Sequence, residues 1–159
     1  SAAIASARQG ARTLLVEQQG CLGGVGANAL VGLWLGAWGR DGAYQVIRGV
    51  FAEIVQRLAA EGAALAVADA PPEGGRHVAY ANWHKRVIPF DVEAYKRIAE
   101  TIALEAGAHL RYFTSVVSPQ SKDGRIEGVF LHAKSGMEFV RARCVVDATG
   151  DDVEEDKQS

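Results

Sequence analysis

A single carboxylate followed by a pair of glycines gives the sequence its clearest chemical signal. Glu17 closes the short run 12–17, whose centre is apolar and β-branched, and Gly23 and Gly24 follow a few residues later. A carboxylate at the end of a strand can accept hydrogen bonds from the hydroxyl groups of a ribose. Glycines let the backbone turn sharply and let its N–H groups approach a ligand, because no Cβ stands in the way. The pattern therefore predicts a nucleotide site.

The position of Glu17 resembles the end of the second strand in a dinucleotide-binding fold. In such folds the acid stands about 20 residues after a glycine-rich loop that binds the phosphates. Counting back that far from Glu17 passes residue 1, so we expect the glycine-rich loop to lie outside this sequence. Residues 1–7 are small and apolar and are then predicted to belong to the first helix, with Gly10 as its C-cap.

Composition restricts the class of protein. The 159 residues are 48% apolar, which is enough for one ordinary domain with a hydrophobic core. A formal net charge of −2 and scattered basic residues give no reason to expect a nucleic acid or an anionic membrane as partner. The two cysteines, Cys21 and Cys144, have no metal-binding or disulfide spacing. We expect reduced thiols, no metal site and a cytoplasmic location.

Two helices are predicted in the middle of the chain. Apolar residues recur at helical spacing over residues 46–60, and Gly62 ends that run. Asp91 is a natural N-cap for the second helix, which Gly107 closes. Between the two helices, residues 69–77 are rich in proline and glycine and are predicted to form a loop.

The last third of the chain changes from helical to strand periodicity. Residues 110–117 are predicted to form a strand, and Asp123-Gly124 is a strong hairpin signal before a second strand at 126–133. A third short strand follows a Ser-Gly turn, which completes an antiparallel meander. Residues 144–149 are nearly all apolar and are predicted to form a buried strand.

In this order and spacing, the elements resemble those of FAD-dependent oxidoreductases with two dinucleotide-binding domains. The motifs that carry the resemblance are Ala2–Glu17, Leu22-Gly23-Gly24, Arg48-Gly49-Val50, Pro89-Phe90-Asp91 and Val145–Asp151. The resemblance implies an α/β, Rossmann-like FAD-binding fold: a parallel sheet with an antiparallel β-meander and a helical insert, here without its first strand. The β-meander favours the flavin fold over a nicotinamide-dependent dehydrogenase, which remains an alternative.

The resemblance also implies a domain organisation. Residues 1–44 and 89–151 would form a partial FAD-binding domain, and residues 45–88 a helical and loop insert. Residues 152–159 are polar and acidic and are predicted to be a disordered tail. In the complete fold a further strand would separate residues 12–17 from residues 144–149, so its absence would expose two strand edges. We expect the chain either to self-associate along those edges or to close the gap by shifting its sheet.

Six residues are implied as cofactor-binding. Glu17 would bind the ribose of the AMP half of FAD, and Gly23 and Gly24 would approach the pyrophosphate or ribityl chain. The backbone of Val116 would read the edge of the adenine, and Gly150 and Asp151 would come close to the cofactor. The structural alternatives are a solvated acid, a plain turn and an ordinary sheet residue.

The function implied is flavin-mediated hydride or electron transfer on a small molecule, while the sequence assigns neither the substrate nor a catalytic residue. The alternative from another class is a non-catalytic remnant of a flavoprotein that acts as a binding or assembly module without cofactor. Two other features have chemical and structural interpretations. The Cys21 thiol is a candidate for redox chemistry, although a lone cysteine is more often inert. Trp34 and Trp38 are candidates for stacking on a flavin, although packing in the core is favoured.

Overall fold

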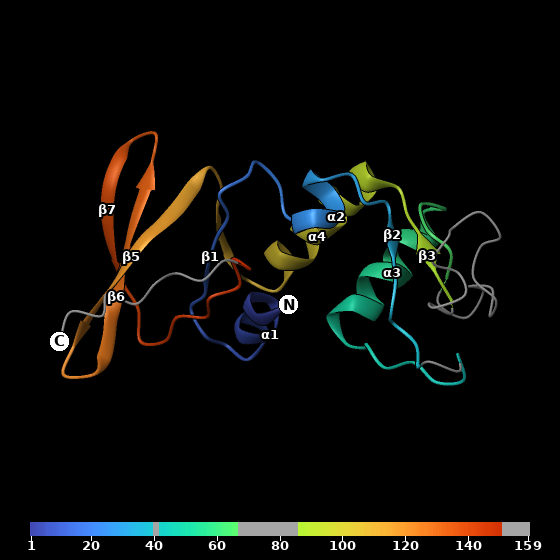
Figure 1. Ribbon diagram of the computed structural model, residues 1–159, viewed down its shortest axis with the longest axis horizontal. Helices are drawn as coiled ribbons and strands as arrows, with labels where there is room; N and C mark the ends of the chain where they lie inside the picture. Colours follow the sequence, from blue (N-terminus) through green and yellow to red (C-terminus); the bar gives the residue numbers. More distant parts are fainter. Residues whose placement is uncertain (40–41, 67–85, 151–159) are drawn as a thin grey trace.

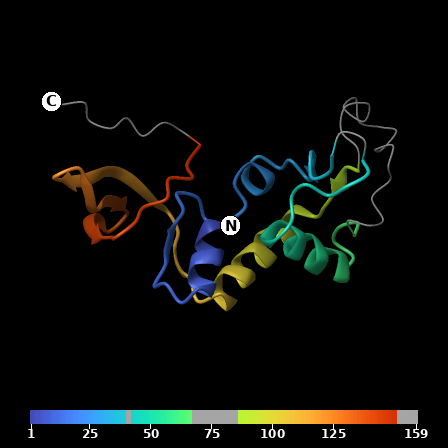
Figure 2. The same cartoon turned by 90° about the horizontal axis from the view of Figure 1, so that it is seen from below.

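The computed structural model describes residues 1–39, 42–66 and 86–150. The described elements follow one another along an elongated molecule (Figures 1 and 2). A β-meander of residues 114–141 lies at one end. At the other end lie helix α3, Val50–Ala60, and two short strands, β2, Leu33–Trp34, and β3, Ile88–Pro89. Between the two ends lie helices α1, Ala2–Arg8, and α4, Val92–Glu105, and the strand pair of β1, Leu14–Val16, and β4, His109–Arg111.

The N-terminal part has the predicted order of helix, turn and strand. Helix α1 spans Ala2–Arg8, and Gly10 follows with a φ of +83°, so the predicted glycine cap is confirmed in position. Strand β1 spans Leu14–Val16 and pairs in parallel with β4, His109–Arg111. The strand is only partly covered, because Leu15 and Val16 are half-buried while Leu14 is exposed.

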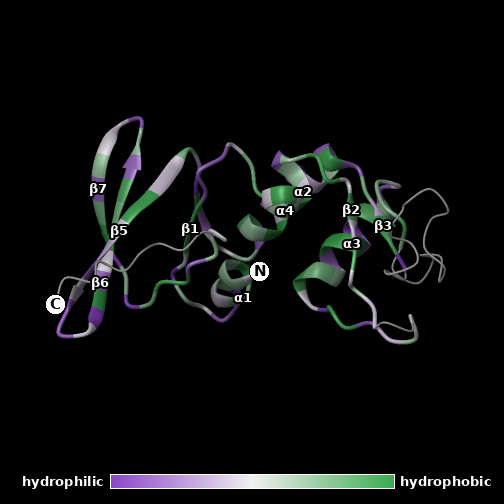
Figure 3. Ribbon diagram, in the orientation of Figure 1, coloured by the Kyte–Doolittle hydropathy of each residue, from purple (hydrophilic) through white to green (hydrophobic). Residues whose placement is uncertain are grey.

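Helices α3 and α4 supply most of the core. Helix α4 spans Val92–Glu105 and begins at Asp91, whose Oδ1 accepts a hydrogen bond of 2.7 Å from the amide of Ala94, which confirms the predicted N-cap. Both helices contribute to one hydrophobic cluster, whose fully or nearly fully buried members include Ile4, Leu22, Leu58, Phe90, Ile98 and Ile102. Figure 3 shows hydrophobic residues on both α3 and α4.

The helix predicted over residues 46–60 begins four residues later than predicted. Helix α3 spans Val50–Ala60, because Gly49 precedes it with a φ of +65°. The amides of Val46 and Ile47 instead donate to the carbonyl of Ala37, at 2.9 and 3.2 Å. The backbone before Gly49 is therefore hydrogen-bonded to the loop that contains Ala37. These hydrogen bonds decide its conformation, and the helical spacing of its apolar residues does not.

A strand pair and an aromatic cluster connect the chain segments on the two sides of the predicted insert. Strand β2, Leu33–Trp34, pairs antiparallel with β3, Ile88–Pro89. Trp34 stacks on Phe90 with ring centroids 3.8 Å apart, and Phe51 and Tyr95 meet its ring edge-on. The packing interpretation of Trp34 is thus confirmed. The division into domain and insert stays a prediction, and the loop predicted at 69–77 lies outside the described residues.

The β-meander is confirmed, with a different beginning. Strands β5, Thr114–Lys122, β6, Arg125–Ala133, and β7, Gly136–Arg141, form one antiparallel sheet in that order. Asp123 and Gly124 have φ angles of +51° and +71°, as a two-residue type I′ hairpin requires. The strand predicted at 110–117 is divided, because Phe113 has a φ of +51° and separates β4 from β5.

The buried strand predicted at 144–149 is wrong. This segment follows β7 without strand structure, and Val145 and Val146 are 36% and 65% exposed. A strand needs a hydrogen-bonding neighbour. Among the described residues the only parallel partner of β1 is β4, and no strand lies ready to pair with residues 144–149. The predicted tail 152–159 lies outside the described residues.

Candidate functional site

Glu17 lies directly beyond the carboxyl end of β1, held there by its own backbone. Its amide donates to the carbonyl of Arg111 at 2.9 Å, and its carbonyl accepts from the amide of Thr114 at 3.1 Å. The side chain folds over the following turn, where Oε1 accepts from the amide of Gln19 at 2.8 Å. No hydrogen bond from the described residues reaches Oε2. One carboxylate oxygen therefore remains ready to accept a hydroxyl group.

The loop after Glu17 packs against the turn between β4 and β5. The amide of Phe113 donates to the carbonyl of Gln19 at 3.2 Å. A Cβ on Gly20 would stand 2.6 Å from Cζ of Phe113, so the ring fills the place of a side chain at residue 20. Figures 1 and 2 both show this loop beside the beginning of β5. Segments almost a hundred residues apart thus share one surface with Glu17.

Gly23 and Gly24 need to be glycines for different reasons. Gly23 has a φ of +120°, and a Cβ there would stand 2.6 Å from Cβ of Ala27 and 2.8 Å from Cε1 of Tyr95. Gly24 has a φ of +52°, but nothing lies within 4 Å of the place of its Cβ. The short helix α2, Gly24–Asn28, follows immediately. Close packing explains why residue 23 is a glycine, whereas the backbone of Gly24 has open space beside it.

Polar side chains between this loop and α4 are paired with one another. The thiol of Cys21 donates to Oδ1 of Asn28 at 3.2 Å, and the hydroxyl of Tyr112 donates to Oε2 of Glu100 at 2.8 Å. Burial, the hydrogen bond to Glu100 and the negative charge of Glu100 raise the pKa of Tyr112. Tyr112 therefore stays protonated and ties the end of β4 to α4.

Val116 and Gly150 lie on different parts of the C-terminal region. Val116 lies on β5 and pairs with Leu131 of β6. Since β5 is an edge strand of the meander, some of its backbone groups face away from the sheet. Gly150 is exposed, with a φ of +81°. Just before it, Oδ1 of Asp147 accepts from the amide and the hydroxyl of Thr149, at 2.9 and 2.7 Å, and these bonds lower the pKa of Asp147.

The structure therefore brings together only part of the predicted set. One backbone hydrogen bond joins Glu17 to Thr114, at the start of the strand β5 that carries Val116. Gly23 and Gly24 follow in the same loop. No hydrogen bond between described residues joins Gly150 to that loop, and Asp151 lies outside the described residues.

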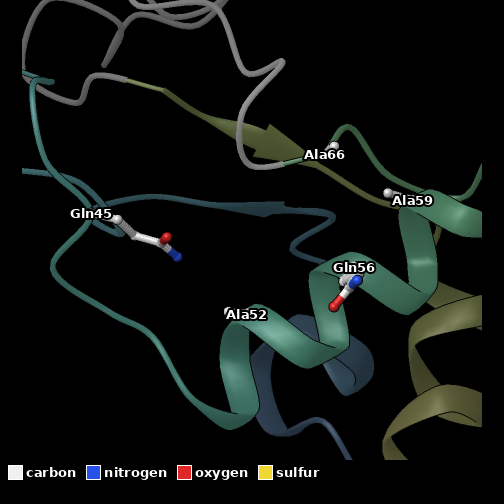
Figure 4. A pocket seen from close by; sticks show the side chains of 5 residues that line it. All are labelled: Gln45, Ala52, Gln56, Ala59 and Ala66. Carbon is white, nitrogen blue, oxygen red and sulfur yellow. The ribbon is translucent and has the colours of Figure 1, made fainter.

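A pocket of about 250 Å³ lies elsewhere, beside α3 (Figure 4). Its lining is neutral and consists of Gln45, Ala52, Gln56, Ala59 and Ala66. The amide nitrogen of Gln45 is already bonded to the carbonyl of Ile47, at 2.8 Å. The pocket offers no acid, base or nucleophile, so it is not part of the candidate site.

A family model for FAD dependent oxidoreductases matches residues 1–152. The chain belongs to this family. Its cofactor is therefore FAD, and the nicotinamide alternative loses its support. No curated protein sequence matches the chain.

Solved structures agree on the flavoprotein fold. The THI4 protein of Thermovibrio ammonificans matches with a TM-score of 0.53 and 17% identity, over 94% of this chain and 52% of that one. CabE, an aromatic hydroxylase from angucycline biosynthesis, matches with a TM-score of 0.53 and 18% identity, over 89% of this chain and 26% of that one. A geranylgeranyl bacteriochlorophyll reductase-like protein from Thermoplasma acidophilum gives a TM-score of 0.50 at 13% identity, over 89% and 34%. This family member thus spans about half or less of the length of these proteins.

The Glu17 loop has features that suit FAD. The free carboxylate oxygen of Glu17 suits a ribose hydroxyl, and the space beside Gly24 would be filled by a Cβ. Within the described ranges no group of histidine, cysteine and acidic side chains is arranged to hold a metal ion. No helix among these residues is both long and apolar enough to cross a membrane.

Sequence reasoning missed two aromatic residues of this region. Tyr95 covers Gly23 and Gly26, yet in the sequence it is one more apolar position of a helix. Phe113 stands within a stretch with strand composition, and nothing in the sequence marks its positive φ. The one sign of this contact in the sequence is the glycine at residue 20, which has no side chain and so makes room for the Phe113 ring.

Proposed function

We propose that this chain forms an FAD-binding part of an oxidoreductase, with Glu17 as the acceptor for the ribose of the AMP half. The observation that carries the proposal is the fixed position of Glu17, whose backbone is bonded on both sides to the β4–β5 segment while Oε2 stays free. A carboxylate held in this way needs no rearrangement to accept a hydroxyl group, which favours binding.

The other predicted contacts extend the same proposal. Gly23 and Gly24 would approach the pyrophosphate or ribityl chain, and the free edge of β5 supports a backbone contact from Val116 to the adenine. Gly150 and Asp151 would approach the cofactor from the C-terminal segment. When bound, FAD supplies hydride or electron transfer at its isoalloxazine ring, while the protein supplies binding and orientation.

A direct test measures FAD binding by the purified chain. We expect a yellow preparation that releases FAD on denaturation, or colourless protein that binds added FAD and quenches its fluorescence. Replacing Glu17 by Gln removes the charge but keeps the size of the side chain. A hydrogen bond to a charged group contributes about 1.5–3 kcal/mol, so we expect FAD affinity to fall at least about tenfold.

The matched control is Glu127→Gln on strand β6. Glu127 is exposed, and among the described residues its carboxylate accepts a hydrogen bond only from the side-chain amide of Gln120, at 3.5 Å. This variant should bind FAD as the unchanged protein does. Colourless protein that does not bind FAD would instead support the non-catalytic remnant, and equal binding by Glu17→Gln would refute the role of Glu17.

Self-association and a cytoplasmic location complete the proposal. Among the described residues strand β1 pairs only with β4, which leaves one edge of β1 for a second copy of the chain. The cytoplasmic location is supported by the free thiols of Cys21 and Cys144, because the cytoplasm keeps cysteines reduced. Sedimentation across a range of concentrations tests the first point. A monomer at every concentration would contradict it.

A further inference from the structure

Phe113 has a backbone conformation that its side chain disfavours. Its φ of +51° lies in the left-handed region, where bulky side chains are rare and strained. The residue is also 71% exposed, so burial of apolar surface does not compensate for the strain. Strained residues of this kind persist when the surroundings fix them, and they gather at ligand-binding sites.

The residues around Phe113 fix it from both sides. Tyr112 is tied to Glu100 through its hydroxyl. Thr114 is only 2% exposed, and its hydroxyl donates to the carbonyl of Tyr112 at 2.9 Å, across the strained residue. The turn 112–114 is therefore rigid and presents the Phe113 ring at a constant place.

That place is next to Glu17. The amide of Phe113 bonds to Gln19, and the amide of Thr114 bonds to Glu17 itself. The tip of the ring rests on Gly20, which has no side chain to displace it, and most of the ring remains open to solvent. An aromatic surface thus lies against the loop that carries Glu17, the acid that we assign to the ribose, and on the segment that leads to Val116.

We propose that Phe113 is the stacking residue for the adenine base of FAD. The inference rests on the function proposed for Glu17, because the base is attached to the ribose that this acid would hold. An aromatic ring stacks on any purine through its π-face, and a ring that is already rigid loses little conformational freedom on binding. Binding would cover an apolar surface that the unbound chain leaves exposed.

The test compares Phe113→Gly, Phe113→Asn and Phe113→Tyr. Glycine and asparagine tolerate the positive φ, so neither variant should lower the melting temperature of the ligand-free protein. Both remove the stacking surface, and we expect the dissociation constants of FAD and ADP to rise together by about tenfold. Phe113→Tyr keeps the aromatic ring and should bind both ligands within about twofold of the unchanged protein.

Three outcomes would overturn the inference. Unchanged FAD affinity in Phe113→Gly and Phe113→Asn, with normal binding by the original protein, would refute stacking by Phe113 and leave the role of Glu17 intact. Weaker FAD binding with unchanged ADP binding would place the ring on the flavin half instead of the adenine. Failure of the original protein to bind FAD or ADP would refute the proposed function and this inference together.

Discussion

The two neighbouring glycines at residues 23 and 24 should respond very differently to the same substitution. In Gly23→Ala the new Cβ would stand 2.6 Å from Cβ of Ala27 and 2.8 Å from Cε1 of Tyr95, well inside the roughly 3.5–4.0 Å of a carbon–carbon contact. Tyr95 cannot easily move away. Trp34 and Phe90 meet its ring edge-on, each with a centroid distance of 5.1 Å.

The magnitudes follow from strain and packing. A side chain at the φ of +120° of Gly23 costs about 1–3 kcal/mol, and an added carbon in a packed region costs about another 1–3 kcal/mol. We therefore expect Gly23→Ala to lower the free energy of unfolding by about 4 kcal/mol. For Gly24→Ala the left-handed backbone costs about 1–2 kcal/mol, partly offset by about 0.4–1 kcal/mol of lost freedom in the unfolded chain. Its net effect should be about 1 kcal/mol.

Urea unfolding followed by tryptophan fluorescence measures both values. The contact with Ala27 has its own check, because Ala27→Gly removes the atom that the new Cβ would meet. In a double-mutant cycle Ala27→Gly should recover part of the stability lost in Gly23→Ala, with a coupling free energy of about 1 kcal/mol or more. If the two glycine variants differ by less than about 1 kcal/mol, the packing of Tyr95 and Ala27 on Gly23 is not as described.

Two further predictions concern the scaffold. Asp91→Ala removes the acceptor for the amide of Ala94 and should lower the free energy of unfolding by about 1 kcal/mol, whereas Asp91→Asn should be nearly neutral in the same urea experiment. Hydrogen bonds from Arg8 and then Arg57 lower the pKa of the Glu53 carboxyl below its ordinary 4.5. Since the folded pKa is the lower one, the stabilisation is present at neutral pH and disappears as the pH falls through that value. Glu53→Gln should therefore destabilise by less than about 1 kcal/mol at pH 7 and by less still at pH 3, and an equal loss at both would contradict the ion-pair explanation.

Local signals in the sequence were enough for many of the elements. The capping side chain of Asp91 indicates where helix α4 begins. The dipeptide Asp123-Gly124 indicates the first hairpin, because its two residues can adopt the positive φ angles that the turn requires. Glu17 was predictable because the acid follows its own short strand. In each of these cases the determining interaction joins residues close together in the chain.

The features that sequence reasoning missed depend on distant contacts. Strands β2 and β3 pair across more than fifty residues, and their aromatic cluster has no periodic pattern. The break at Phe113 depends on carbonyl groups of the loop after β1, so a stretch with strand composition gives no sign of it. Residues 144–149 show the opposite error: an apolar pattern predicts a strand, but only a neighbouring strand can form one.

Three residues around the candidate site have positive φ angles, and they do not share one cause. Gly23 is a glycine because Ala27 and Tyr95 leave no room for a side chain, and Gly24 because its left-handed backbone disfavours one. Phe113 has the same kind of backbone with a large exposed ring, where glycine would be the more stable choice. Folding therefore explains the two glycines but leaves the phenylalanine unexplained. A ligand contact supplies the missing reason, because selection for binding can retain a residue that costs stability.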